Sequence, residues 1–256
     1  MSEAKLLKNE REFVIPGEEI VKSTDFLPGK NCFREGESIF AKKIGIVHLE
    51  NRVISLIPLN STYIPHAYDM VIGEVVDIQN NGWVVDIKAP DTAFLSLSGV
   101  REFVKNGEDL SKYYALGDVI SAKIHSVNGS STYLSMQDRV ARKLKEGVIL
   151  KVNPAKVPRI IGKQGSMINA IKDKTGTRIS VGQNGFVWVQ GENIDLVKKV
   201  IETIEKESFS EGLTEKIAEM LDKETKKTKV KEAPEKPKVK KNSSGDDKND
   251  KRKEKK

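Results

Sequence analysis

The stretch of residues 160–166, with the sequence IIGKQGS, constrains the fold of this chain more than any other stretch. Its two glycines, Gly162 and Gly165, flank Lys163 and Gln164, with apolar residues before the loop and an amphipathic run after it. Glycine has no Cβ, so the backbone can approach another molecule closely. If a helix begins at Ser166, its N-terminus favours a phosphate group. The loop is therefore either a clamp for a phosphate backbone or an ordinary glycine turn between two helices, and its context has to decide.

The residues around this loop, from 140 to 209, predict an α/β unit with the element order βααββα. Apolar alternation, helical spacing of apolar residues and a glycine-rich turn at 182–185 carry the prediction. The expected elements are a strand at 148–152, a short helix ending at the loop, a helix at 166–173, strands at 178–181 and 186–189, and a helix from Ile194 to Ile204.

A GxxG loop between two helices of a βααββα unit resembles a KH domain, whose loop clamps the backbone of about four nucleotides. The resemblance implies that Gly162 and Gly165 are the two glycines of the clamp and that Lys163 meets a phosphate. The residues predicted to bind RNA here are Arg159, Ile161, Gly162, Lys163, Gln164, Gly165 and Ser166. The nearby Lys156, Lys172, Lys174 and Arg178 either add positive charge to this surface or are ordinary solvated side chains.

The preceding residues, 64–139, predict a five-stranded closed OB barrel. Short strands rich in β-branched residues alternate with Gly, Asn, Asp and Ser, and a longer excursion separates the third strand from the fourth. The expected strands are 71–78, 83–87, 92–97, 119–127 and 133–136. Motifs spread along the segment, among them NGWVVDI at 81–87 and LGDV at 116–119, resemble the RNA-binding OB domain of the ribosomal protein S-one type.

The barrel departs from that family where bases would stack. The resemblance places Asn81, Val84 and Ser96 at positions that commonly carry aromatic or histidine side chains. Each stacked base contributes about 1 to 3 kcal/mol, so the barrel is expected to contact RNA weakly or at other positions. The candidates are Trp83, Phe94 and Lys123. For the two aromatic residues, a place in the barrel core or at a partner interface is the alternative.

The two ends of the chain carry no arrangement for chemistry. Residues 1–63 predict a small β-rich unit, with strands at 44–49 and 52–57 around a tight turn, that serves as a structural or docking domain. Residues 210–222 predict one more amphipathic helix. The stretch 223–256 is a charged tail with almost no apolar side chains, and we expect it to be disordered.

Charge is unevenly distributed along the chain. From Asp222 to the last residue there are 15 basic and 8 acidic side chains, whereas the preceding residues hold 29 of each, so the body is neutral. Any basic face on the body must therefore come from segregation of charge. No apolar run approaches the roughly 20 residues that span a bilayer. The single cysteine, Cys32, excludes an internal disulfide, and a cytoplasmic protein is expected.

The sequence shows no catalytic constellation, metal site or cofactor motif. His48, His66 and His125 are isolated, and the Gly162 loop does not continue as a Walker A motif. A binding role, rather than an enzymatic one, is therefore predicted.

The order of units over roughly residues 10–210 is N-terminal β unit, OB barrel, KH domain, which makes the chain multi-domain, mainly β and then α/β. This order resembles the RNA-binding cap subunit of the archaeal exosome, whereas polynucleotide phosphorylase has KH before OB. The resemblance implies a non-catalytic subunit that sits in three copies on a hexameric ring of RNase-PH-like proteins. There it binds single-stranded RNA and guides its 3′ end to phosphorolytic sites. The alternatives are a free-standing RNA-binding factor in translation or RNA chaperoning, and a scaffold that has lost RNA binding.

Overall fold

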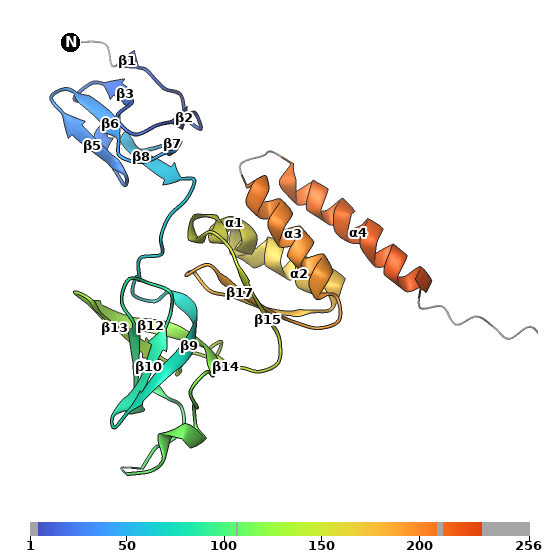
Figure 1. The fold of residues 1–256 in the computed structure, drawn as a ribbon. Helices are drawn as coiled ribbons and strands as arrows, with labels where there is room; N and C mark the ends of the chain where they lie inside the picture. Colours follow the sequence, from blue (N-terminus) through green and yellow to red (C-terminus); the bar gives the residue numbers. More distant parts are fainter. Residues whose placement is uncertain (1–4, 106, 209–211, 232–256) are drawn as a thin grey trace, which may run out of the picture.

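The computed structural model describes residues 5–105, 107–208 and 212–231. These residues form an N-terminal β unit, a β-barrel and an α/β unit followed by a long helix (Figure 1). No helix within the described ranges is both long and apolar enough to cross a membrane.

The N-terminal unit consists of two four-stranded sheets packed around a small core that includes Val14, Ile20, Ile39 and Ile54. The sheet orders are β1-β3-β6-β5 and β2-β7-β8-β4. The strands are β1 (Lys5–Leu6), β2 (Phe13–Val14), β3 (Glu19–Lys22), β4 (Leu27–Pro28), β5 (Cys32–Glu35), β6 (Ser38–Ala41), β7 (Gly45–Glu50) and β8 (Val53–Pro58). The β7–β8 hairpin confirms the predicted pair of strands and the turn between them.

The barrel domain has the five predicted strands and is closed, because β13 pairs with β11 on one side and with β12 on the other. The strands are β9 (Met70–Gln79), β10 (Gly82–Asp86), β11 (Ala93–Ser96), β12 (Val119–Asn128) and β13 (Ser131–Ser135). A further short strand that the sequence did not predict, β14 (Arg142–Leu144), pairs with β12 and leads the chain out of the barrel.

The third unit has the predicted βααββα order. Its antiparallel sheet, in the order β15-β17-β16, is covered on one face by helices, and α4 packs on α2 and α3 (Figure 1). The elements are β15 (Val148–Lys151), α1 (Val157–Ile161), α2 (Ser166–Thr175), β16 (Arg178–Val181), β17 (Phe186–Gln190), α3 (Ile194–Lys206) and α4 (Leu213–Lys231).

The helix α4 corrects the predicted end of ordered structure. The sequence placed the helix at 210–222 and a disordered tail from 223, but α4 continues to Lys231. This extension contains Lys, Glu and Thr and a single apolar residue, Val230. Lys and Glu are good helix formers, so the helix can continue after its apolar face has ended. The rest of the predicted tail lies outside the described residues.

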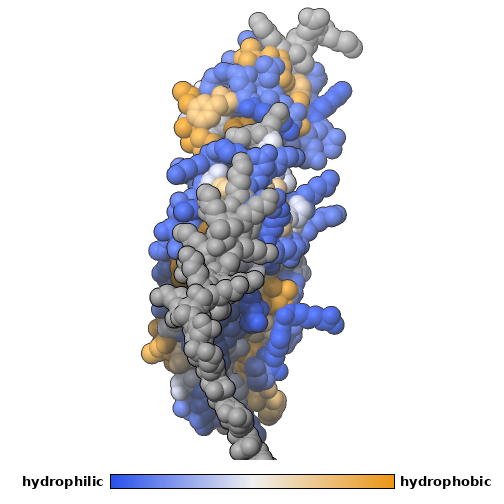
Figure 2. Space-filling model, turned by 90° about the vertical axis from the view of Figure 1, so that its right-hand side faces the viewer, coloured by the Kyte–Doolittle hydropathy of each residue, from blue (hydrophilic) through white to orange (hydrophobic). Residues whose placement is uncertain are grey.

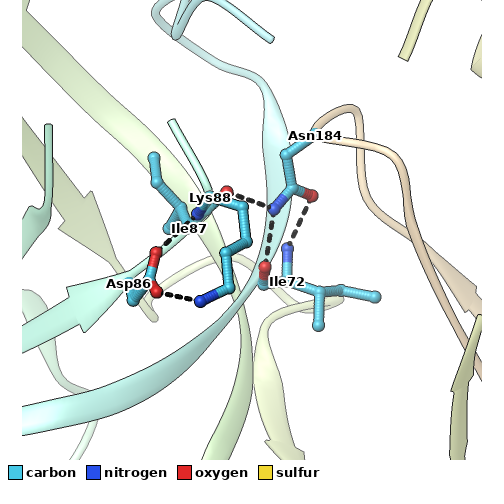
Figure 3. A network of polar contacts seen from close by, with 5 residues as sticks. All are labelled: Ile72, Asp86, Ile87, Lys88 and Asn184. Carbon is cyan, nitrogen blue, oxygen red and sulfur yellow. Dashed lines mark hydrogen bonds and ion pairs between the residues drawn. The ribbon is translucent and has the colours of Figure 1, made fainter. Parts of the chain in front are cut away.

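One buried side chain, Asn184, ties the turn between β16 and β17 to the barrel (Figure 3). Its Oδ1 accepts the backbone N–H of Ile72 at 3.2 Å, and its Nδ2 donates to the carbonyl oxygens of Ile72 at 2.7 Å and Ile87 at 2.8 Å. The backbone N–H of Gln183 also donates to Met70 O, at 2.7 Å. A Cβ on Gly182 would lie 2.9 Å from Ile72 N, so this close approach requires glycine.

Apolar packing supports the same junction. Ile72 and Leu144 on the barrel side form a buried cluster with Phe186 and Trp188 of β17. The guanidinium of Arg142 lies 5.5 Å from the centre of the Trp188 ring. The barrel and the α/β unit therefore form one body.

A second asparagine, Asn153, joins the segment after β8 to the α/β unit. Its Nδ2 donates to Leu59 O at 3.1 Å, and its own backbone N–H donates to Glu205 Oε1 at 3.0 Å. Its Oδ1 accepts the N–H of Ala155 at 3.0 Å. Asn153 thus holds the connection between the N-terminal unit and the barrel against the third unit.

We predict that Asn184→Ala lowers the free energy of unfolding by about 3 kcal/mol, because it leaves the N–H of Ile72 and two carbonyl groups without partners in a buried place. Urea unfolding followed by circular dichroism measures this loss. Gln183→Ala is the matched control, since it keeps the backbone N–H that bonds Met70, and its midpoint stays near that of the wild type. Equal midpoints for the two variants would contradict the role given to the Asn184 amide.

Candidate nucleic-acid interface

The glycine loop lies between α1 and α2, where its backbone takes a conformation suited to glycine. Gly162 has φ 75° and Gly165 has φ 80°, and Gln164 between them is also left-handed, with φ 53°. A Cβ on Gly162 would lie 2.7 Å from Met167 Cβ and 2.8 Å from Met167 N. Side chains larger than hydrogen are therefore excluded at Gly162 by both backbone angle and space.

The loop presents polar side chains on an apolar base. Lys163, Gln164 and Ser166 are exposed, and the half-buried Ile161 packs against the core of the α/β unit. Ser166 is the first residue of α2, so the positive end of this helix dipole points toward the loop. The arrangement can accept a phosphate beside a cation at Lys163.

The cations near the loop differ in how they are held. Lys163 has no acidic partner among the described residues. By contrast, the Lys156 amine donates to Glu205 O at 2.6 Å, and Lys174 pairs with Asp222. Arg159 is exposed in the last turn of α1, one turn before the loop. The positive charge at the loop therefore comes from the placement of single cations beside it, and not from a large positive field.

The barrel corrects the prediction for Trp83. Its side chain has 0% exposure, its Nε1 donates to Tyr114 O at 2.9 Å, and its ring meets Tyr114 edge to face. The indole belongs to the barrel core, and its N–H is hydrogen-bonded by the long segment between β11 and β12. Trp83 therefore cannot stack on a base.

Phe94 lies on the outer surface of the barrel, beside Tyr133, which the sequence motifs did not indicate as a site residue. Its ring meets the ring of Tyr133 edge to face, with 6.5 Å between the two ring centres. Both residues line a groove of about 480 Å³. Asn81 and Val84 line the same groove. The groove thus has aromatic groups, but they come from β11 and β13, whereas the family pattern expects them at the positions of Asn81 and Val84. Buried and exposed side chains alternate strictly along β13, and this alternation places Tyr133 on the outside of the barrel. The same alternation was the sequence signal that could have identified Tyr133.

Lys123 lies on the outside of β12, apart from that groove. Its Nζ is 3.1 Å from Asp138 Oδ2 and 5.7 Å from the centre of the Tyr68 ring. The N–H of Val140, together with Lys123, holds the pKa of Asp138 below its usual value, so this carboxylate is ionised at neutral pH. The structure does not bring Lys123 to the Phe94 groove or group it with Trp83.

The described residues contain no group of three or more His, Cys, Asp or Glu side chains that could hold a metal ion.

The fold and the glycine loop define the chain as a protein built from an OB barrel and a KH domain. A family profile described as "KH domain" matches residues 147–206, and one described as "RRP4, S1 domain" matches residues 62–126.

Similar proteins extend the match over most of the chain. The "Exosome complex component Rrp4" of Thermococcus kodakarensis is 40% identical over 227 residues, which cover 85% of this chain and 87% of the relative. The protein of the same name from Methanothermobacter thermautotrophicus is 38% identical over 223 residues, covering 86% and 71%. A crystal structure assigned as an exosome complex RNA-binding protein has a TM-score of 0.57 and 30% identity, and the match covers 66% of this chain and 99% of that one. The chain belongs to the archaeal Rrp4 family.

We predict that replacing Lys163 and Gln164 together by Asp weakens binding of single-stranded RNA by about tenfold or more, because it places two carboxylates against the phosphate backbone. Fluorescence anisotropy at several salt concentrations measures the change. The slope of log affinity against log salt should fall by about 0.7 for the lost phosphate contact.

The matched control for this double variant is Lys198→Asp with Lys199→Gln on the exposed side of α3, which changes the net charge by the same amount. Equal losses in the two double variants would mean that the loop acts only through total charge, against the clamp.

Proposed function

We propose that the protein is a non-catalytic RNA-binding subunit of an exosome. It binds single-stranded RNA and guides the 3′ end to phosphorolytic sites on a hexameric ring of RNase-PH-like proteins, on which three copies of the chain sit, in the cytoplasm. The observation that carries the proposal is the exposed GxxG loop with Lys163, on a KH domain fixed to an OB barrel. Membership of the Rrp4 family supports the assembly, since the relatives carry the name exosome complex component.

The described surfaces suggest a division of roles in RNA binding. The loop residues from Arg159 to Ser166 hold the phosphate backbone, as the positive φ of both glycines and the exposed Lys163 permit. The groove at Phe94 and Tyr133 offers aromatic faces to a base and contains no Lys or Arg among its lining residues. Neither contact alone is strong, but a rigid junction makes the second one effectively intramolecular.

The N-terminal unit has the features of a protein-docking surface. Phe13 is 49% and Ile57 is 41% exposed, and both lie opposite Ile46 in neighbouring strands of one sheet. Cross-strand neighbours share a face, so these side chains form an apolar row. Figure 2, turned to the right-hand side of the molecule, shows hydrophobic side chains also at the top, over this unit. Contiguous exposed apolar groups mark contacts with other proteins.

We predict that Phe13→Asp with Ile57→Asp weakens assembly with the RNase-PH-like ring by about tenfold or more, because charges replace apolar contact area. Native mass spectrometry and size-exclusion chromatography of the mixed proteins measure assembly.

The control is Phe103→Asp, the same kind of change at an 86% exposed residue in the excursion of the barrel. This variant should assemble normally. If the wild-type chain stays monomeric with ring proteins present and still binds RNA, the protein is a free-standing RNA-binding factor instead.

A further inference from the structure

Tyr68, just before β9, has a backbone conformation that is unfavourable for its side chain. Its φ is 73°, in the left-handed region where bulky residues are rare. The residue is also 74% exposed, so burial in a core does not compensate for this conformation. Strained residues of this kind gather at binding sites, where the surrounding structure fixes them.

Hydrogen bonds on both sides hold Tyr68 in this conformation. Its N–H donates to Ile124 O at 2.8 Å, and the N–H of Ile124 donates back to Asp69 O at 2.8 Å. The carboxylate of Asp69 accepts the hydroxyl of Tyr63, itself buried, at 2.8 Å. Tyr68 is therefore presented on a fixed backbone, so ligand binding has to order only the torsions of its side chain.

The surroundings of the ring suit a nucleobase with its phosphate. The amine of Lys123 lies 5.7 Å from the ring centre, held by Asp138. His66, two residues before Tyr68, and His125, two residues after Lys123, are both exposed. An aromatic face next to a cation binds a base by stacking and attracts the backbone. Protein docking would instead need a contiguous apolar patch, and charged and imidazole side chains interrupt one here.

The position of Tyr68 separates it from both sites described above. It shares no residue with the groove at Phe94 and Tyr133. Met70, two residues later, accepts the N–H of Gln183 from the KH turn, so Tyr68 lies beside the junction of the two domains. We propose that Tyr68, beside Lys123, is a further base-stacking site of the barrel for single-stranded RNA. This inference rests on the proposed RNA-binding function.

The test uses the full chain and a fluorescently labelled oligoadenylate. Tyr68→Gly removes the ring and suits the left-handed backbone, so it should weaken RNA affinity by about tenfold, the loss of one stacked base, while the melting temperature does not fall. Tyr68→Phe keeps the aromatic face and should restore the affinity to within about twofold. Phe103→Gly, which removes another highly exposed ring from the same domain, is the matched control and should bind as the wild type does.

A direct readout comes from Tyr68→Trp. Stacking of a base should quench the fluorescence of the exposed indole when RNA is added, whereas Trp83 and Trp188 are buried and give a constant background. Quenching that follows the binding isotherm supports the proposal.

The outcomes separate this site from the proposed function. If Tyr68→Gly binds RNA as tightly as the wild type while the Lys163 and Gln164 double variant is weakened, the stacking site is wrong and RNA binding stands. If Tyr68→Gly loses assembly with the ring at unchanged RNA affinity, Tyr68 is a protein contact and the proposal is overturned. A wild-type chain without measurable RNA affinity would overturn the function itself.

Discussion

The buried amide of Asn184 is the interaction on which the arrangement of the proposed RNA-binding surfaces depends. It satisfies one N–H and two carbonyl groups of the barrel from a turn of the KH domain. Three bonds to fixed backbone groups determine both distance and orientation, which apolar contact alone would leave adjustable. The loop at Gly162 and the barrel surface consequently keep one relative position, and RNA binding does not have to order two domains against each other.

A fixed arrangement matters because the body of this chain has no excess of positive charge. Non-specific RNA binding is mostly counterion release, which scales with the number of phosphates neutralised. Here Lys163 is exposed, but Lys156 and Lys174 are already engaged with protein groups. Few phosphate contacts remain, so stacking surfaces and preorganised geometry must supply more of the affinity.

Sequence patterns predicted the barrel strands and the KH elements because these depend on local alternation, helical spacing and glycine turns. The side chains that complete the surfaces depend on pairings distant in sequence. Tyr133 meets Phe94 only because β13 closes the barrel beside β11. Trp83 packs in the barrel core, and its buried indole N–H is satisfied by the carbonyl of Tyr114, which is distant in the sequence. Nothing near Tyr68 in the sequence marks a left-handed tyrosine, since that conformation is imposed by its bonds to β12.

The KH domain is also the element that connects the two other units. Asn184 binds the barrel from one end of its sheet, and Asn153 binds the segment after β8 from the start of its helices. Asn184 and Asn153 each use one side-chain amide to bond backbone groups. These contacts therefore depend on the two asparagines and only slightly on which side chains their partners carry. The segment that follows the N-terminal sheet is thereby held near the start of the KH helices. In the role proposed above, the N-terminal unit docks and the other two units hold RNA. That role needs this coupling, because movement between the units would misdirect the RNA relative to the docking surface.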